Sequence, residues 1–150
     1  MRHTRYQGAI IKDDHILLIR HTEYASGRSY WVIPGGGREP NETEIECVQR
    51  EMAEETNLEV EVIRFLFETT LPNDRFNKTR KTFLCSAVTG QPSPGIEPEE
   101  DAAALYAITD VAWFDLRTDE RWDPAIFENQ IAFPILQEIR RALGYLPPSE

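Results

Sequence analysis

Alternating apolar and polar residues predict a series of short strands, separated by polar segments rich in Gly, Pro, Asn and Asp. The strands are expected at residues 5–12, 15–20, 30–33, 58–70, 78–88 and 111–115. Asp13 and Asp14 join the first two as a hairpin or strand pair, and a turn over 71–77 joins 58–70 to 78–88. Loops are expected at 21–29 and 89–101, whereas 102–108 has residues of both helix and strand preference.

Helical spacing appears first between Glu42 and Glu55 or Thr56, where apolar residues recur every three or four positions. The apolar stripe consists of Ile45, Val48 and Met52. Asn41 precedes this segment and is a suitable N-cap.

A second helical region begins at Asp123 and Pro124 and runs toward Leu143, with Gly144 as its stop signal. Pro134 is expected to break or kink it, because proline cannot donate a backbone hydrogen bond. Short strands combined with two helical regions predict an α+β sandwich.

The composition of the chain indicates a single domain over residues 1–150, since 150 residues can bury a sizeable core. A net charge of −10 argues against a general nucleic-acid binder, although bound Mg²⁺ can still attract a small nucleotide to an acidic site. The two cysteines, Cys47 and Cys85, match neither a disulfide framework nor a metal spacing. No segment has the length of a signal peptide core or a membrane span, so a soluble, cytoplasmic protein is expected.

The first helical segment places three carboxylates on one flank. At about 100° per residue, Glu51 and Glu55 lie roughly 40° apart, and Glu54 lies about 60° to the other side of Glu51. Oxygen ligands in this number favour Mg²⁺ or Mn²⁺, and Mg²⁺ in proteins commonly binds substrate phosphates as well. The same projection turns Arg50 away from this flank, with Glu46 as its partner one turn earlier.

A solvated acidic helix face is the alternative interpretation of these carboxylates, but the residues before the helix favour the metal. From Gly36 to Leu58 the chain has the spacing G-x5-E-x7-R-E-U-x-E-E-x-N-U, where U is a bulky aliphatic residue. This pattern resembles the signature of the Nudix hydrolases, with Asn57 in place of the final glycine. Asn is the second most common residue, after glycine, in the left-handed conformation that ends helices.

The resemblance implies the Nudix fold, an α/β/α sandwich with a mixed sheet between helices. It also implies a divalent cation, Mg²⁺ with Mn²⁺ as an option, held by Glu51, Glu54, Glu55 and the carbonyl of Gly35. The matching Arg50 would orient Glu51, and Glu42 would support the turn into the helix. In this family the general base is either a glutamate of the signature or an acid from a later loop. For this chain Glu99 or Glu100 is the favoured loop residue, among the acids Glu97, Glu99, Glu100, Asp101 and Asp110.

The activity that the resemblance implies is hydrolysis of a phosphoanhydride in a nucleoside diphosphate linked to another moiety. A (deoxy)nucleoside triphosphate is ranked first, because the chain has no obvious extra domain. ADP-ribose or a nucleotide sugar, and a dinucleoside polyphosphate, are the alternatives. None of the additional motifs of the NADH or coenzyme A branches is seen.

Substrate contacts are expected outside the signature, chiefly at Arg20, Arg28 and Tyr30. The wider set of candidate phosphate contacts is Arg20, His21, Arg28, Arg75, Lys78, Arg80 and Lys81, and the candidate stacking residues are Tyr24, Tyr30 and Phe76.

Two other classes of protein are open. The chain could be a Nudix-like module that senses a nucleotide without cleaving it, or an isomerase-type relative acting on an isoprenoid diphosphate. The intact set of carboxylates argues against the first, and the lack of a cysteine in a catalytic context argues against the second. The expected partner is a small nucleotide, not a long nucleic acid or a membrane, and a homodimer is possible.

Overall fold

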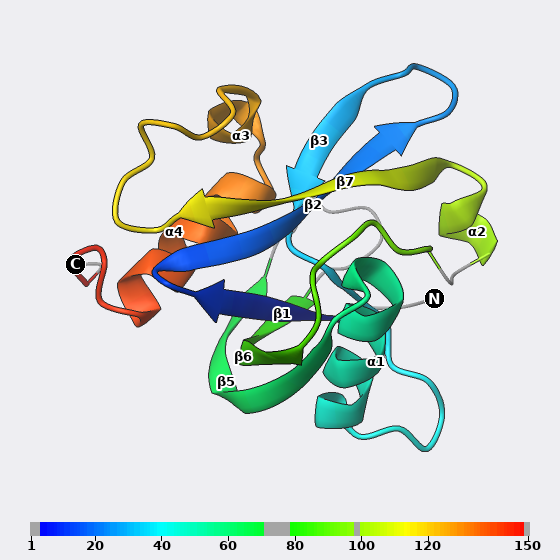
Figure 1. The fold of residues 1–150 in the computed structure, drawn as a ribbon, viewed down its shortest axis with the longest axis horizontal. Coiled ribbons are helices and arrows are strands. Elements are labelled where there is room, and N and C mark those ends of the chain that lie inside the picture. The colour runs from blue at the N-terminus through cyan, green and yellow to red at the C-terminus, as the bar shows by residue number, and fades with distance from the viewer. Residues whose placement is uncertain (1–3, 71–78, 98–99, 149–150) are drawn as a thin grey trace.

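The computed structural model describes residues 4–70, 79–97 and 100–148, without the side chains of Glu100 and Asp101. The predicted turn at 71–77, which includes Arg75 and Phe76, lies outside the described residues, as do Lys78 and the candidate Glu99. Figure 1 shows a twisted sheet at the centre, with α1 and α4 on different sides of it. The elements in chain order are β1 (Thr4–Lys12), β2 (His15–Glu23), β3 (Ser29–Val32), β4 (Gly35–Gly36), α1 (Glu44–Thr56), β5 (Glu59–Thr70), β6 (Thr79–Thr89), α2 (Glu100–Ala103), β7 (Tyr106–Asp115), α3 (Ala125–Glu128) and α4 (Ala132–Ala142).

The sheet has the strand order β3-β2-β1-β6-β5, with β4 paired to β1 and β7 paired to β2. β1 and β6 run parallel, whereas the other pairs are antiparallel. A mixed sheet with helices on different sides of it is the architecture that the sequence predicted. The β1–β2 hairpin is also confirmed: Asp13 and Asp14 both have positive φ, 50° and 63°, as a tight two-residue hairpin turn requires.

Alternation along β1 and β2 sends side chains to two separate apolar clusters. Ile10 and Leu17 face α1, where they pack with Val48 and Met52. Ile16 and its neighbours on the same face pack with α4 instead. Because successive strand residues point to opposite faces, both helices are held by the same pair of strands.

Several boundaries differ from the prediction. β2 continues to Glu23 and β7 begins at Tyr106, so residues 21–23 of the expected loop and 106–108 of the ambiguous segment are strand, whereas Ala102 and Ala103 belong to α2. These two strands pair along their whole lengths, and that pairing stabilises residues with weak strand preference of their own. The two-residue strand β4 was not predicted, since glycines alone carry no strand signal.

The C-terminal helical region is interrupted, but Pro134 is not the cause. The break falls between α3 and α4, and Pro134 lies in the first turn of α4, where its missing N–H is not needed. Asn129 ends α3, and its side-chain oxygen accepts the N–H groups of Ile131 and Ala132 at 3.0 and 2.9 Å. The prediction of a break at Pro134 is therefore wrong. No helix within the described residues is long and apolar enough to cross a membrane.

Candidate active site

The α1 helix begins two residues later than predicted. Thr43, not Asn41, is the N-cap: its hydroxyl accepts the N–H of Glu46 at 3.0 Å, and the Glu46 carboxylate accepts the N–H of Thr43 at 2.9 Å. This reciprocal capping box is worth about 1 kcal/mol at the N-cap alone. The carboxylate of Glu46 therefore caps the start of the helix. The predicted Glu46–Arg50 pair does not form, and Arg50 pairs with Glu42 instead.

The C-terminus of α1 ends on Asn57 in the left-handed conformation, with φ 59° and ψ 25°. This is the backbone geometry expected where the family pattern has glycine. The side-chain amide of Asn57 also donates to the carbonyl oxygens of Ser93 and Pro94, both at 3.3 Å, and to the hydroxyl of Ser93 at 2.8 Å. A glycine here would make none of these contacts.

The loop after β6 closes over this helix end. The N–H groups of Ser93, Gly95 and Ile96 donate to the carbonyl oxygens of Thr56, Glu55 and Glu54, at 3.0, 2.9 and 2.9 Å. The last carbonyls of a helix otherwise lack partners, so the loop satisfies them and is held in place. A side chain at Gly95 would run into the backbone of Glu54, and glycine allows this close approach.

Glu51 and Glu55 are almost fully buried, with 1% and 0% of their surface exposed. The N–H of Gly35 donates to Oε1 of Glu55 at 2.7 Å. Burial raises the pKa of Glu51 to about 7 and that of Glu55 well above its ordinary value, although the positive charges of Arg50 at Glu51 and of Arg5 at both groups oppose these shifts. A Cβ on Gly36 would overlap the Glu51 carboxylate, so glycine leaves the space in which this carboxylate lies.

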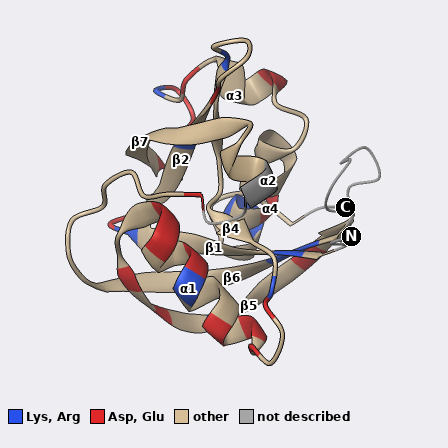
Figure 2. Cartoon of the chain, turned by 90° about the vertical axis from the view of Figure 1, so that its right-hand side faces the viewer, with Lys and Arg blue, Asp and Glu red and all other residues tan. Residues whose placement is uncertain are grey.

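Arg50 connects the loop before α1 to the carboxylates on the helix. Its guanidinium donates to Glu42 at 2.7 and 2.9 Å, to Glu51 at 3.0 Å and to Glu54 at 3.1 Å. It also donates to the carbonyl oxygen of Gly37 at 3.1 Å. Contrary to the helical projection, the long side chain of Arg50 reaches round to the acidic flank. In Figure 2, α1 carries acidic residues along its length.

The site fits a divalent cation. Oε2 of Glu51 and Oε2 of Glu55 are both buried, and neither has a hydrogen-bond partner among the described residues. Unpartnered buried carboxylate oxygens are costly unless a cation lies beside them. Glu54 is more open, with 28% of its side chain exposed. Within the described residues its carboxylate does not gather with those of Glu51 and Glu55 into a group of ligand atoms within 4.8 Å of one another, so its role as a third ligand stays a prediction.

Two residues that the signature does not contain also reach this site. His21 on β2, Glu55 and Glu97 each offer a ligand atom, and these atoms lie within 4.8 Å of one another. Tyr106 donates its hydroxyl hydrogen to Glu97 at 3.1 Å and stacks on His21 with ring centroids 4.0 Å apart. Burial, followed by the charge of Arg5, lowers the pKa of His21 to about 3, so the imidazole is neutral.

Sequence reasoning ranked His21 as one of several phosphate contacts and Glu97 as one of several loop acids. The available signal was weak: Glu97 follows a Pro/Gly-rich loop, and His21 lies in a segment read as loop. The pairing of β2 with its neighbouring strands and the anchoring of the loop to α1 bring these two side chains to Glu55.

The predicted substrate contacts lie in different places. Tyr30 on β3 packs its ring edge against His21, with centroids 5.6 Å apart, and is therefore near the site. Arg20 lies over the ring of Trp31 at 5.7 Å and donates to Thr109 at 3.2 Å. Arg28 is exposed between β2 and β3. No contact from Arg20 or Arg28 to the acidic residues of α1 is seen in the described part of the chain, and their role stays a prediction.

Glu100 begins α2, directly after the loop that α1 anchors, but its side chain is outside the described set. Both thiols are buried, and burial raises the pKa of Cys47 and of Cys85 to about 12. Neither cysteine is therefore suited to nucleophilic or acid–base work at neutral pH.

A model of the NUDIX domain matches residues 2–129. The chain belongs to the NUDIX domain family. This match covers the sheet, α1 and its signature, and it agrees with the fold described above.

One curated relative resembles part of the chain in sequence. The NAD-capped RNA hydrolase NudC of Photobacterium profundum is 32% identical over 94 residues, which is 63% of this chain and 34% of that protein. The chain therefore spans about a third of the length of this curated relative.

Two solved structures share the fold at low identity. A UDP-X diphosphatase superimposes with a TM-score of 0.67 at 22% identity, covering 96% of this chain and 64% of that one. An ADP-ribose pyrophosphatase from Streptococcus suis 89-1591 gives a TM-score of 0.65 at 20% identity, covering 100% and 97%. At these identities the likeness establishes the fold and leaves the substrate open.

Proposed function

We propose that this protein is a Nudix-type pyrophosphohydrolase that uses Mg²⁺ to hydrolyse a phosphoanhydride bond in a nucleotide. The observation that carries the proposal is the pair of buried carboxylates, Glu51 and Glu55, each with an oxygen that lacks a partner in the described residues. Such an arrangement disfavours a mere solvated helix face. The burial of both thiols argues separately against an isomerase acting on an isoprenoid diphosphate.

Glu51, Glu54 and Glu55 would hold the cation, with the carbonyl of Gly35 beside them. When bound, the cation would screen the phosphate charge and make the substrate easier for water to attack. Arg50 keeps Glu51 and Glu54 in place through hydrogen bonds, and Glu42 in turn holds Arg50. A network of this kind keeps ligands in the geometry that chemistry needs.

Water attacks phosphorus, the P–O bond to the leaving phosphate breaks, and the proton of the water passes to a carboxylate. We assign this base to Glu100, with Glu99 as its neighbour. The support is positional: the loop that leads to α2 is tied to the end of α1 by three backbone hydrogen bonds. Alanine at Glu99 and at Glu100, tested separately, distinguishes the two, and an unchanged rate in both would return the role to the signature.

For the substrate we propose a (deoxy)nucleoside triphosphate, with Tyr30, Arg20 and Arg28 as contacts to the base or phosphates. Tyr30 is the best supported of these, because it adjoins His21 and hence the carboxylates. ADP-ribose, nucleotide sugars and dinucleoside polyphosphates are the competing substrates, and a nucleotide sensor is the competing function.

The test is Mg²⁺-dependent turnover across a panel of canonical and oxidised dNTPs, ADP-ribose, UDP-sugars, NAD⁺ and dinucleoside polyphosphates, with products identified. One strongly preferred nucleoside triphosphate, releasing pyrophosphate and a monophosphate, is the expected result. If the protein prefers another member of the panel, the proposed substrate is wrong, but the proposed reaction, hydrolysis of a phosphoanhydride, is retained. If the protein binds nucleotides but hydrolyses no member of the panel, the proposal of an enzyme is overturned and a nucleotide sensor is favoured.

A further inference from the structure

His21 occupies an unusual place for a histidine. It lies on β2 at an irregularity in the pairing with β7, between Arg20 and His21, and such bulges redirect side chains. Its ring is packed between Tyr106, stacked at 4.0 Å, and Tyr30, edge-on at 5.6 Å. Only 4% of its surface is exposed, and its Nε2 has no hydrogen-bond partner among the described residues.

A buried ring nitrogen without a partner needs an explanation, because burial of an unsatisfied polar atom costs about 1–3 kcal/mol. Simple packing would be served better by a phenylalanine in the same aromatic stack. His21 instead offers a nitrogen within 4.8 Å of carboxylate oxygens from Glu55 and Glu97. Neutral imidazole and carboxylate together are a common ligand set for first-row metal ions.

The charges around Glu55 also favour a cation. The negative charges of Glu51 and Glu97 repel the Glu55 carboxylate, and the positive charge of Arg5 attracts it. Arg50 adds a second guanidinium at Glu51, but it is shared with Glu42 and Glu54, so carboxylates outnumber guanidinium groups among these residues. The oxygen Oε2 of Glu55 is free of hydrogen bonds within the described part of the chain, whereas Oε1 accepts the N–H of Gly35.

Two features present Glu97 toward His21. Backbone hydrogen bonds from Gly95 and Ile96 fix the preceding loop on α1, and the hydroxyl of Tyr106 holds the Glu97 carboxylate. The same Tyr106 ring stacks on His21. One residue thus positions both a nitrogen and an oxygen donor, as residues around metal ligands commonly do.

We propose that His21, Glu55 and Glu97 bind a second divalent cation, and that the nitrogen of His21 makes this position select Mn²⁺ over Mg²⁺. The proposal rests on the proposed function in one respect, since Glu55 belongs to both cation positions. It adds to that function a ligand that lies outside the signature and a preference for a transition-metal ion.

Mn²⁺ is paramagnetic, so pulsed electron paramagnetic resonance reads the ligand nitrogen directly without any assay of activity. We expect the Mn²⁺-loaded protein to show a ¹⁴N modulation that disappears when histidine is supplied as ¹⁵N-histidine. A titration should find about two Mn²⁺ per chain. Absence of the ¹⁴N modulation in the unlabelled protein would overturn the proposal, whether or not any variant folds.

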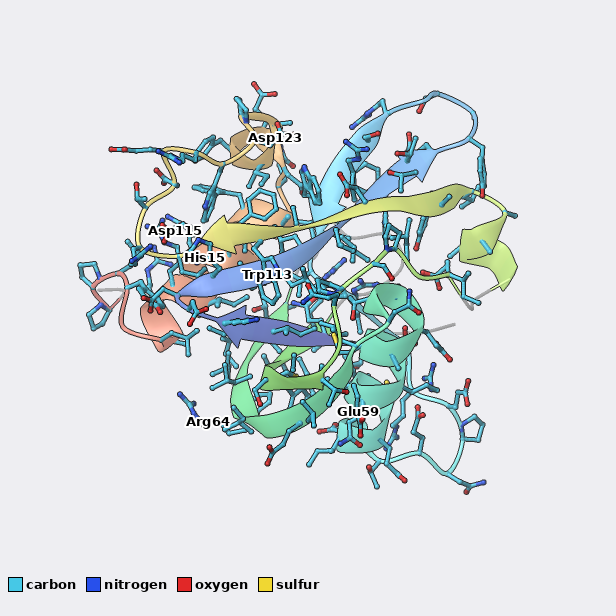
Figure 3. The ribbon with its side chains drawn as sticks, in the orientation of Figure 1. His15, Glu59, Arg64, Trp113, Asp115 and Asp123 are labelled. Atoms are coloured by element: carbon cyan, nitrogen blue, oxygen red, sulfur yellow. The ribbon has the colours of Figure 1, made fainter. Side chains whose placement is uncertain are left out.

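Variants then locate the nitrogen. His21→Phe, which retains a ring against Tyr106, should lose the modulation and one of the bound ions. The matched control is His15→Phe, which changes another histidine of β2 at its opposite end; Figure 3 shows His15 beside Asp115, its partner in the β2–β7 pairing. His3→Gln controls for the remaining histidine of the chain. A modulation that survives in His21→Phe would contradict the proposal.

The outcomes separate this proposal from the proposed function. If the protein hydrolyses a nucleotide with Mg²⁺ but its bound Mn²⁺ shows no histidine nitrogen, the proposed second cation site is rejected and the proposed enzymatic function is kept. If Mn²⁺ is bound by a histidine nitrogen but the protein hydrolyses no nucleotide, the second cation site is kept and the proposed enzymatic function is rejected.

Discussion

At the scale of single residues, Asn57 shows how a departure from a family pattern can add a function to the position. Asparagine tolerates the left-handed backbone that ends α1, with φ 59°. Its amide then makes three hydrogen bonds to Ser93 and Pro94, which a glycine lacks. We infer that this side chain anchors the loop that carries Glu97.

Asn57→Gly should therefore separate the two roles. Glycine keeps the helix cap, so the free energy of unfolding should fall by no more than about 1–2 kcal/mol, the worth of the lost hydrogen bonds. Amide hydrogen exchange at Ser93, Gly95 and Ile96 should become at least several-fold faster, because their loop loses its side-chain anchor. Exchange at these amides that matches the unmutated protein would show that the backbone bonds alone hold the loop.

The same scale shows what the sequence could reveal about the site. The placement of Glu51, Glu54 and Glu55 on α1 was predictable, because helical geometry converts sequence spacing into a shared flank, whereas their role as cation ligands stays a prediction. The reach of Arg50 was not, since a projection of Cα positions ignores the length and flexibility of its side chain. His21 and Glu97 were not singled out either, because they come from segments far from α1 in sequence and meet it only through strand pairing and the loop contacts.

At the scale of elements, α1 and the loop before it act as one unit, joined by Arg50 and Glu42. The β1–β2 hairpin and α1 were predictable from local patterns, since turn residues and apolar spacing carry strong signals. The short strand β4 and the full length of β7 were not, because they depend on partners elsewhere in the sheet. The start of α4 depends on Asn129, whose capping contacts no periodicity reveals.

The Arg50–Glu42 contact gives a testable dependence on pH. Hydrogen bonding to Arg50 lowers the pKa of Glu42 to about 2, from an ordinary value of 4.5. A depressed carboxyl pKa stabilises the fold fully above pH 4.5, and this stabilisation is lost as the pH falls toward 2.

Glu42→Gln should consequently lower the free energy of unfolding at pH 7 by about 1–3 kcal/mol, since Arg50 loses its charged acceptor. The difference from the unmutated protein should shrink at pH 3. Urea unfolding at the two pH values measures both quantities. An equal difference at both would mean that the charge of Glu42 contributes nothing.

At the scale of the whole molecule, the sheet joins three distant parts of the chain into one acidic centre. Residues from β2, from α1 and from the loop after β6 meet at Glu55. The net charge of the chain is −10, so the electrostatic field of the whole protein attracts a cation to this centre, in addition to the attraction of the ligands themselves.

Binding of a cation should stabilise the native state against unfolding, because the unfolded chain has no such site. At about 100 times the dissociation constant the gain is about 2.7 kcal/mol, which corresponds to a rise of roughly 5–10 °C in Tm for a domain of this size. Thermal unfolding with Mg²⁺, and with Mg²⁺ removed by EDTA, measures it. Glu54→Gln should reduce the rise, whereas an equal rise in that variant would indicate binding elsewhere.

The claim on which the account depends is that the carboxylates of α1 hold the cation used in hydrolysis. The most direct measurement is the Mg²⁺-dependent turnover number of Glu54→Gln on the preferred substrate, compared with Glu59→Gln, a neighbouring exposed glutamate at the start of β5 (Figure 3). We predict a loss of roughly 100-fold or more in Glu54→Gln, in proportion to the charge stabilisation removed, and no appreciable loss in Glu59→Gln. Equal turnover in the two folded variants would contradict the assignment of the metal site.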